Sequence, residues 1–318
     1  MSVELLAFRN WSTSDRARAH LFIAAATGEP RGWKLLETLG KDVPARWHLL
    51  ETSALHTAHE IATLMSNRSV ETHQVELPAL GEQLRRMVAS KDGNMHVMLD
   101  VSCMSRTVMA EVFQHLFSLA GAGKITVTVV YALAEFTMPP AHMPPNEDIR
   151  PVSAHFAGWP STSSASTTLI VGLGYEKDKA EGACEYFDPS ETWVFTPRSP
   201  IREYDEQVSA NNQELLARAA RSDREVAYSV DDPEKTFGEL VTVASSLLSR
   251  SNPLILPFGP KIFFAISLLV SLLYREVGVW LVTGDLEGMA VDHKASNHVT
   301  GFTFELSPLP ENLELPST

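Results

Sequence analysis

Basic residues end several short loops at points where an apolar stretch gives way to an expected helix. Arg106 ends the loop 102–106, and Lys261 ends the loop 257–261. A helix N-terminus carries unpaired N–H groups and a partial positive charge of about half a unit, so a cation there is unfavourable unless an anion offsets it. We therefore expect Arg106 and Lys261 to contact a phosphate or a similar anion. The alternative is a salt bridge, or a side chain that extends into solvent.

Two further loops repeat this pattern with other cations. The loop 27–31 ends at Arg31, and the loop 175–179 contains Lys177 and ends at Lys179. In open parallel sheets, ligands bind beyond the carboxyl ends of the strands, where loops of this kind lead into helices. Arg31, Lys177 and Lys179 are therefore further candidate anion contacts, with surface salt bridges as the alternative.

Small residues in the first two loops bear on how closely a ligand could approach. Gly259 permits close backbone approach or a positive φ, and Pro260 suits the first turn of a helix. Ser102 and Ser105 supply hydroxyl groups that could hold a phosphate oxygen or cap the helix that follows. We include Gly259, Ser102 and Ser105 among the candidate ligand-binding residues.

The residue patterns for catalysis are incomplete. Asp100 ends an apolar stretch and could orient Arg106 or a ribose hydroxyl. Cys103 also lies close to Arg106 at an expected helix start, which would lower the pKa of its thiol. The two residues stand closer together than the cysteine and arginine of a phosphatase loop. We therefore assign no catalytic residue.

The residue patterns for metals and cofactors are also incomplete. His56, His59 and Glu60 do not have the His-Glu-x-x-His spacing and lack an evident third ligand. The segment 172–174 contains two glycines of a dinucleotide fingerprint, but Lys177 stands where the third would fall, and no carboxylate ends the next apolar stretch. We expect no metal and no cofactor.

These loops connect short apolar segments with helical patterns along most of the chain. The expected strands are residues 21–25, 47–50, 96–101, 125–132, 169–173, 192–195, 226–230, 254–256 and 277–282. The expected helices are residues 32–39, 58–66, 82–90, 107–120, 179–187, 205–220, 236–248 and 261–274. Strands and helices that alternate at this spacing predict β-α-β units and a mainly parallel sheet.

The order of these segments indicates an internal duplication. Residues 21–39 align with 169–187 at an offset of 148, and residues 96–116 align with 253–273 at an offset near 155. We predict an α/β fold of two tandem, mostly parallel Rossmann-like halves. The boundaries are residues 1–135, a Pro/Ser-rich linker at 136–167, and residues 168–318. The alternative is that two unrelated α/β segments look alike.

Composition limits the partners of the protein. The chain has 39 acidic and 26 basic residues, a net charge of −13, which argues against duplex nucleic acid and anionic membranes as partners. The two cysteines fit a reducing compartment, no signal peptide is visible, and the apolar stretch 262–274 is shorter than the ~20 residues of a membrane span. We expect a cytoplasmic protein.

Two of the loops resemble a known family. Asp100-Val-Ser-Cys-Met-Ser-Arg106 and Gly259-Pro-Lys261 resemble the ligand loop of CARF-like Rossmannoid sensors from prokaryotic antiviral defence systems. Residues 175–179, with Asn212 and Glu214, are similar to duplicated Rossmannoid proteins of the same defence islands. The resemblance implies that a nucleotide messenger is sensed through Ser102, Ser105, Arg106, Gly259 and Lys261. It also implies that the signal passes to a separate effector protein.

Three functions are compatible with these patterns. The leading hypothesis is a non-catalytic regulatory protein that holds a nucleotide-like anion in the cleft between its halves, with Arg106 and Lys261 on either side. The second is an enzyme that acts on a nucleotide or phosphosugar in the same cleft, with Asp100, Glu29, Glu176 or Cys103 as base or nucleophile. The third is a structural subunit that uses Phe156 and Trp159 in an interface. Assembly with further copies of the chain stays open.

Overall fold

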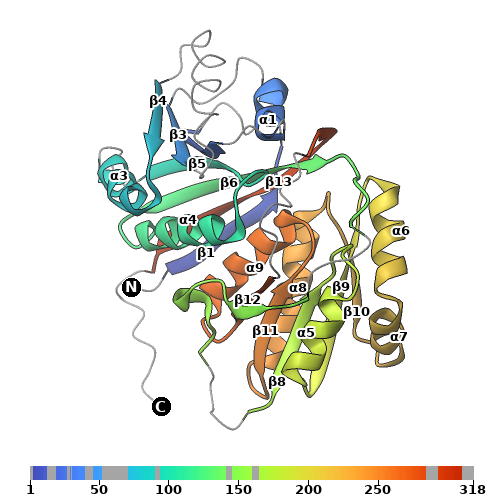
Figure 1. Ribbon diagram of the computed structural model, residues 1–318. Coiled ribbons are helices and arrows are strands. Elements are labelled where there is room, and N and C mark those ends of the chain that lie inside the picture. Colours follow the sequence, from blue (N-terminus) through green and yellow to red (C-terminus); the bar gives the residue numbers. More distant parts are fainter. Residues whose placement is uncertain are drawn as a thin grey trace, which may run out of the picture.

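The computed structural model describes residues 3–12, 19–26, 29, 31–39, 46–51, 71–89, 94–140, 145–159, 165–283 and 293–309. These residues form two mixed, mostly parallel sheets flanked by helices (Figure 1). The predicted α/β fold of two Rossmann-like halves is confirmed. The expected helix 58–66, with His56, His59 and Glu60, lies outside the described residues.

The first sheet is built mainly from the N-terminal half. Its strands are β1 (Val3–Asn10), β2 (Leu21–Ala26), β3 (Arg46–Glu51), β4 (Glu71–Val75), β5 (Asn94–Asp100), β6 (Lys124–Ala134) and β13 (Ala295–Pro308). They lie in the order β1-β13-β6-β5-β2-β3-β4. Strands β4, β3, β2, β5 and β6 are parallel, whereas β13 runs antiparallel to both β6 and β1.

The second sheet is built from the C-terminal half. Its strands are β7 (Asp148–Pro151), β8 (Thr167–Gly172), β9 (Glu191–Arg198), β10 (Glu225–Ser229), β11 (Asn252–Pro257) and β12 (Gly278–Thr283). They lie in the order β10-β9-β8-β11-β12-β7. All neighbours are parallel except β7, which pairs antiparallel with β12 at the edge.

The two parallel sets have the same topology. If β2 to β6 and β8 to β12 are each numbered from one to five, both sheets follow the order 3-2-1-4-5. This identity of strand order is what an internal duplication predicts. The matched strands β5 and β11 are each followed by a helix that begins with a cation, Arg106 in one half and Lys261 in the other.

The sheets cross the predicted domain boundaries in two places. Strand β13, from the end of the C-terminal segment, pairs with β6 and β1 in the first sheet. Strand β7, from the expected linker, pairs with β12 in the second sheet. The linker also packs through Phe156, which is fully buried, whereas Trp159 is 65% exposed. The predicted domain boundaries at residues 135 and 167 stay a prediction, and both sheets contain strands from beyond them.

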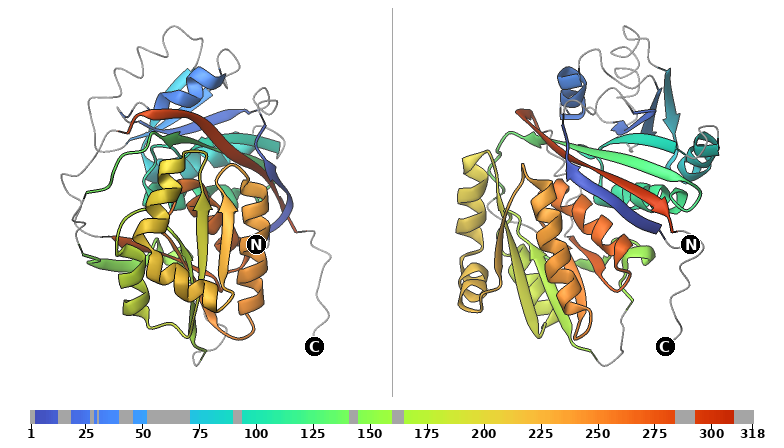
Figure 2. Two further views of the ribbon diagram at one scale, coloured as in Figure 1. Left: turned by 90° about the vertical axis from the view of Figure 1, so that its right-hand side faces the viewer. Right: turned by 180° about the vertical axis from the view of Figure 1, so that it is seen from behind.

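Helices cover the sheets and join the halves. They are α1 (Arg31–Leu39), α3 (Leu77–Ala89), α4 (Arg106–Leu119), α5 (Lys179–Phe187), α6 (Arg202–Asn211), α7 (Gln213–Arg221), α8 (Pro233–Leu247) and α9 (Lys261–Leu273), with the short η2 (Ala154–Phe156). Ser105 caps α4 by accepting a hydrogen bond from Val108 N, and Asp232 caps α8 in the same way. Helix α9 is buried on all sides because it lies between the second sheet and α4 (Figure 2).

The expected helix 205–220 is two helices, α6 and α7, which meet at Asn212. The side-chain amide of Asn212 donates to the carbonyl oxygens of Val208 and Gly174. Asparagine side chains of this kind compete with backbone hydrogen bonding and favour a break in a helix. The break positions the loop that follows β8, because Gly174 lies in that loop.

Candidate functional site

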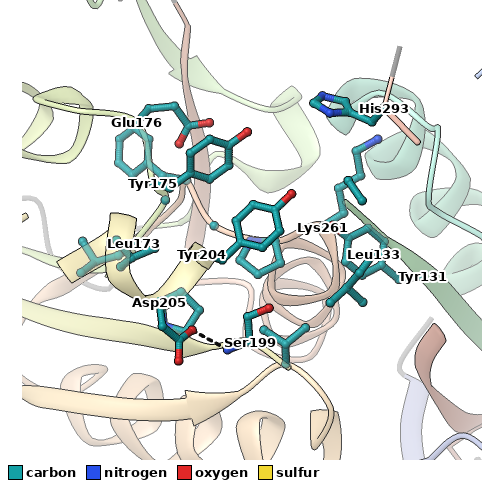
Figure 3. A pocket seen from close by; sticks show the side chains of 18 of the residues that line it. Tyr131, Leu133, Leu173, Tyr175, Glu176, Ser199, Tyr204, Asp205, Lys261 and His293 are labelled. Carbon is teal, nitrogen blue, oxygen red and sulfur yellow. Dashed lines mark hydrogen bonds between the residues drawn. The ribbon is translucent and has the colours of Figure 1, made fainter. Parts of the chain in front are cut away.

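A pocket lies where the carboxyl ends of both sheets face each other. Its volume is about 250 Å³, close to the lower end, about 300 Å³, of the range usual for small-molecule sites. It is lined by the ends of β6, β9 and β10, by the loops after β8 and β11, and by the first residues of α1, α4 and α9 (Figure 3). Sites beyond the carboxyl ends of parallel strands are the rule in open α/β sheets.

Arg106 and Lys261 line this pocket and each reaches into the opposite half. The guanidinium Nη2 of Arg106 donates to the carbonyl oxygens of Phe258 and Gly259, at 3.3 and 3.0 Å. Lys261 Nζ donates to the carbonyl oxygen of Ser102, at 2.8 Å. The two contacts are reciprocal, because each cation starts a helix and binds the loop that precedes the matching helix. Backbone carbonyl groups thus provide part of the negative charge that these helix starts require.

Burial changes the proton affinity of both cations. It lowers the pKa of Lys261 to about 8, and the nearby Arg31 charge acts in the same direction. It also lowers the pKa of Arg106, against the opposing effect of Glu176. The Nε atom of Arg106 is buried and has no hydrogen-bond partner among the described residues. A buried donor without a partner is uncommon in folded proteins, so part of the hydrogen-bonding capacity of Arg106 is not used by the fold.

Arg31 is the third cation of the pocket. It is buried at the first position of α1, and its Nε donates to the carboxylate of Glu29. Burial opposes its charge, but the bond to Glu29 raises the pKa of Arg31 overall. Arg31 therefore stays charged, and part of its charge is already neutralised by its neighbour.

The other four predicted residues do not line the pocket. Ser102 is fully buried and its hydroxyl accepts a hydrogen bond from Ala132 N. Ser105 is exposed and caps α4, which is one of the two roles predicted for it. Lys177 is exposed, and Lys179 donates to the carbonyl oxygen of Pro145. Of the eight predicted residues, the pocket therefore brings together Arg31, Arg106, Gly259 and Lys261.

Glycines allow the loops after β8 and β11 to touch through their backbones. A Cβ atom on Gly259 would lie 2.6 Å from the carbonyl oxygen of Leu173, and one on Gly174 would lie 2.8 Å from that of Phe258. Gly259 does allow a close backbone approach, but the group that approaches is the neighbouring loop of the same chain, and its contact with a ligand stays a prediction.

The pocket also contains aromatic residues that the sequence patterns did not single out. The rings of Tyr175 and Tyr204 meet at a centroid distance of 5.3 Å, and Phe136 meets the Tyr204 ring at 5.1 Å. Asn211 Nδ2 holds the loop of Tyr175 by donating to its carbonyl oxygen at 2.6 Å. Tyr131 forms another wall, from the end of β6. Isolated tyrosines in a strand, a loop and a helix carry no spacing signal, so only the fold could bring them together.

Carboxyl groups lie on the same surface as these cations. Glu176 lines the pocket next to Tyr175, and burial raises its pKa. Asp205 also lines it and accepts a hydrogen bond from Ser199 N at 2.7 Å. The site is therefore bipolar, with Arg31, Arg106 and Lys261 opposed by two acidic groups.

For the loop after β5, the lowered pKa expected of Cys103 was wrong. Of the two roles expected of Asp100, orienting Arg106 was wrong, and orienting a ribose hydroxyl stays a prediction. Burial, the largest influence, raises the pKa of Cys103, so the thiol is not activated by the nearby cations. Asp100 does not orient Arg106; instead, its Oδ1 accepts a hydrogen bond from Ser102 N at 2.8 Å. Burial raises the pKa of Asp100 to about 6, against the effect of that hydrogen bond and of Lys261.

The described residues contain no group of three or more His, Cys, Asp or Glu side chains arranged to hold a metal ion. In the same part of the chain, no helix has the length and apolar character needed to cross a membrane.

Comparison of the sequence with protein-family models gave no match, and comparison with curated proteins gave no significant match. The resemblance to CARF-like sensors therefore rests on the loops at 100–106 and 259–261 and stays a prediction. What the chain does has to be inferred from the pocket itself.

Proposed function

We propose that the protein binds a small, nucleotide-like anion in the pocket between its two halves. The observation that carries the proposal is that Arg31, Arg106 and Lys261, each the first residue of its helix, surround one cavity. An anionic oxygen in the pocket would accept hydrogen bonds from the charged side chains that line it, Arg106 and Lys261 among them. It would also offset the cost of keeping Lys261 charged in a partly dehydrated site.

The proposed role is regulatory. The ligand would contact loops of both halves at once, because Arg106 belongs to the first half and Gly259 and Lys261 to the second. Binding would therefore alter the contact between the halves and could be detected by a separate effector protein. The resemblance of loops 100–106 and 259–261 to CARF-like sensors supports a place in a multi-protein antiviral defence system.

Calorimetric titration with adenosine 5′-monophosphate tests the proposal. Lys261→Gln removes the charge and keeps a donor for the Ser102 carbonyl, whereas Lys177→Ala removes an exposed lysine outside the pocket. We expect Lys177→Ala to bind like the wild type and Lys261→Gln to bind about tenfold more weakly or worse. The reason is that a hydrogen bond to a charged group contributes about 1.5–3 kcal/mol.

Thermal unfolding of each variant checks that the fold is intact. Equal affinities of the wild type and Lys261→Gln would contradict the proposal, as would the absence of binding to the wild type.

An enzyme acting on a nucleotide or phosphosugar in this pocket is the second candidate. Glu176 favours it, because the carboxyl group lines the pocket and its raised pKa suits a general acid or base. Chromatography of adenosine 5′-monophosphate after incubation with the protein separates the two functions. A product that disappears with Glu176→Gln would favour the enzyme, and unchanged nucleotide would favour the binding protein.

A further inference from the structure

One side of the pocket is an aromatic wall made by Tyr175 and Tyr204. Figure 3 shows both rings on the side of the pocket opposite Tyr131 and Lys261. The two rings contact each other at 5.3 Å and 64°, and Phe136 supports them from the segment that follows β6. Aromatic surfaces of this kind stack on heterocyclic rings and contribute about 1–3 kcal/mol per base.

The wall is held in place by hydrogen bonds to the backbone. Asn211 Nδ2 donates to the Tyr175 carbonyl oxygen at 2.6 Å, and the Tyr204 hydroxyl donates to the Glu135 carbonyl oxygen at 3.2 Å. The Glu135 backbone N–H in turn donates to the carbonyl oxygen of Lys294. These bonds hold the Tyr204 ring and the backbone of Tyr175 before any ligand arrives, which lowers the entropy cost of binding.

A hydrogen-bond acceptor lies directly beside this wall. The carboxyl group of Glu176 follows Tyr175 in the chain and folds over Gly174, where a Cβ atom would collide with its Oε2. Because Gly174 has no side chain, the Glu176 carboxyl group can occupy this position. A carboxylate oxygen accepts hydrogen bonds from amino groups, and it repels the oxygen atoms of a phosphate.

The two sides of the pocket thus differ in the groups they favour. Lys261 and Arg106 favour an anion, Tyr175 and Tyr204 favour a flat ring, and Glu176 favours an N–H donor on that ring. We infer that the pocket selects nucleotides whose base carries an amino group, with the base on the tyrosine wall, its amino group on Glu176, and the phosphate toward Lys261. This inference rests on the proposed function and assigns the specificity to Glu176 and the two tyrosines.

A matched pair of ligands tests the role of Glu176. Adenosine 5′-monophosphate and purine riboside 5′-monophosphate differ only in the amino group of the base. We expect the wild type to bind the first about tenfold more tightly in calorimetric titration, because it alone donates to Glu176. Glu176→Met removes every strong acceptor at this position and should reduce this preference to about twofold or less.

A second set of variants tests the wall. Tyr175→Leu should weaken both nucleotides about tenfold and leave ribose 5-phosphate, which has no base, unchanged. Tyr186→Leu is the control, since Tyr186 is 67% exposed and does not line the pocket. It should bind both nucleotides like the wild type.

The outcomes separate this inference from the proposed function. Equal affinity of the wild type for the two nucleotides, or an undiminished preference in Glu176→Met, would overturn the inference. If ribose 5-phosphate bound as tightly as adenosine 5′-monophosphate and still required Lys261, the inference would fall while anion binding stood. If none of the three bound, both would fall.

Discussion

At the scale of single residues, the site depends on two cations, each of which donates hydrogen bonds to backbone carbonyl groups in a loop of the other half. Arg106 and Lys261 both begin helices, where the helix dipole opposes a positive charge. Their contacts to the carbonyl groups of Phe258, Gly259 and Ser102 provide compensation within the protein. Burial lowers the pKa of Lys261 to about 8, and Arg106 Nε has no hydrogen-bond partner among the described residues. These two residues are therefore both structural and available for a ligand.

The pH dependence of ligand binding should report on Lys261. Its pKa of about 8 means that the anion-binding form, which is charged, is lost as the pH rises through 8. We expect the affinity for adenosine 5′-monophosphate to fall above pH 8 by up to about tenfold per pH unit. Titrations between pH 7.5 and 9.5 measure this, because burial raises the pKa values of Tyr131 and Tyr175 above that window.

The matched control for this experiment is Lys261→Met, which has no titrating group at this position. Its affinity should be low and independent of pH. A wild-type affinity that is equal at pH 7.5 and 9.5 would show that Lys261 does not contact the anion.

At the scale of elements, most helices and strands that contact the core could be predicted, because their apolar residues follow a clear period. Helix α5 begins and ends at the predicted residues, and α9 differs by one residue at its end. Strands β1, β4, β7 and β13 were not predicted. Strands β1, β4 and β7 lie at sheet edges, and β13 lies next to one. Segments such as Glu71–Val75, in which four consecutive residues are polar, contain no apolar run that would indicate a strand.

The candidate site could be predicted only in part, for a related reason. Arg106 and Lys261 were found because a local rule, the charge at a helix start, applies to each. The wall of Tyr175 and Tyr204 depends on contacts between a loop and a helix nearly thirty residues apart, and no local rule describes such a contact.

The contact between the loops after β8 and β11 gives a prediction at this scale. Gly259→Ala places a methyl group 2.6 Å from the Leu173 carbonyl oxygen, where both partners are backbone and neither can rotate away. We expect a loss of about 2 kcal/mol in the free energy of unfolding, measured by urea denaturation. The variant should also bind adenosine 5′-monophosphate more weakly, because Phe258 and Lys261 shift with the loop.

Gly238→Ala is the control. Gly238 lies in α8, and a Cβ atom there meets nothing within 4 Å. This variant should gain about 0.5–1 kcal/mol, since alanine favours a helix. A Gly259→Ala variant as stable as the wild type would mean that the two loops are free to separate.

At the scale of the whole molecule, the halves share one hydrophobic core. A single cluster of buried residues includes Phe113 of α4 and Phe304 of β13, which belong with the first sheet, and Phe263 and Leu269 of α9, which belong with the second. Strand β1 adds direct contacts, because Phe8 stacks on Phe237 of α8 at a centroid distance of 4.2 Å. Two sheets that could each form a domain are therefore joined into one cooperative body.

This shared core predicts that heat unfolds both halves together. Calorimetry should give one transition, and circular dichroism and tryptophan fluorescence should give the same midpoint. Phe8→Ala should lower the free energy of unfolding by about 2 kcal/mol and shift that single transition without splitting it. Two separate transitions in the wild type would show that the halves fold independently.

The pairing of β1 with β13 has a mechanical consequence. Val3 lies opposite Pro308, at the same end of the two antiparallel strands. A force that pulls these residues apart would break the ladder one pair at a time, as in a zipper, and so would meet little resistance. In the chain, the second sheet is inserted between β6 and β13 of the first sheet. Where the chain enters and leaves this insertion, the N–H of Glu147 donates to the carbonyl oxygen of Thr283 at 2.9 Å. Tension would therefore reach residues 147–283 only after the first sheet had opened, so the second half is mechanically shielded by the first.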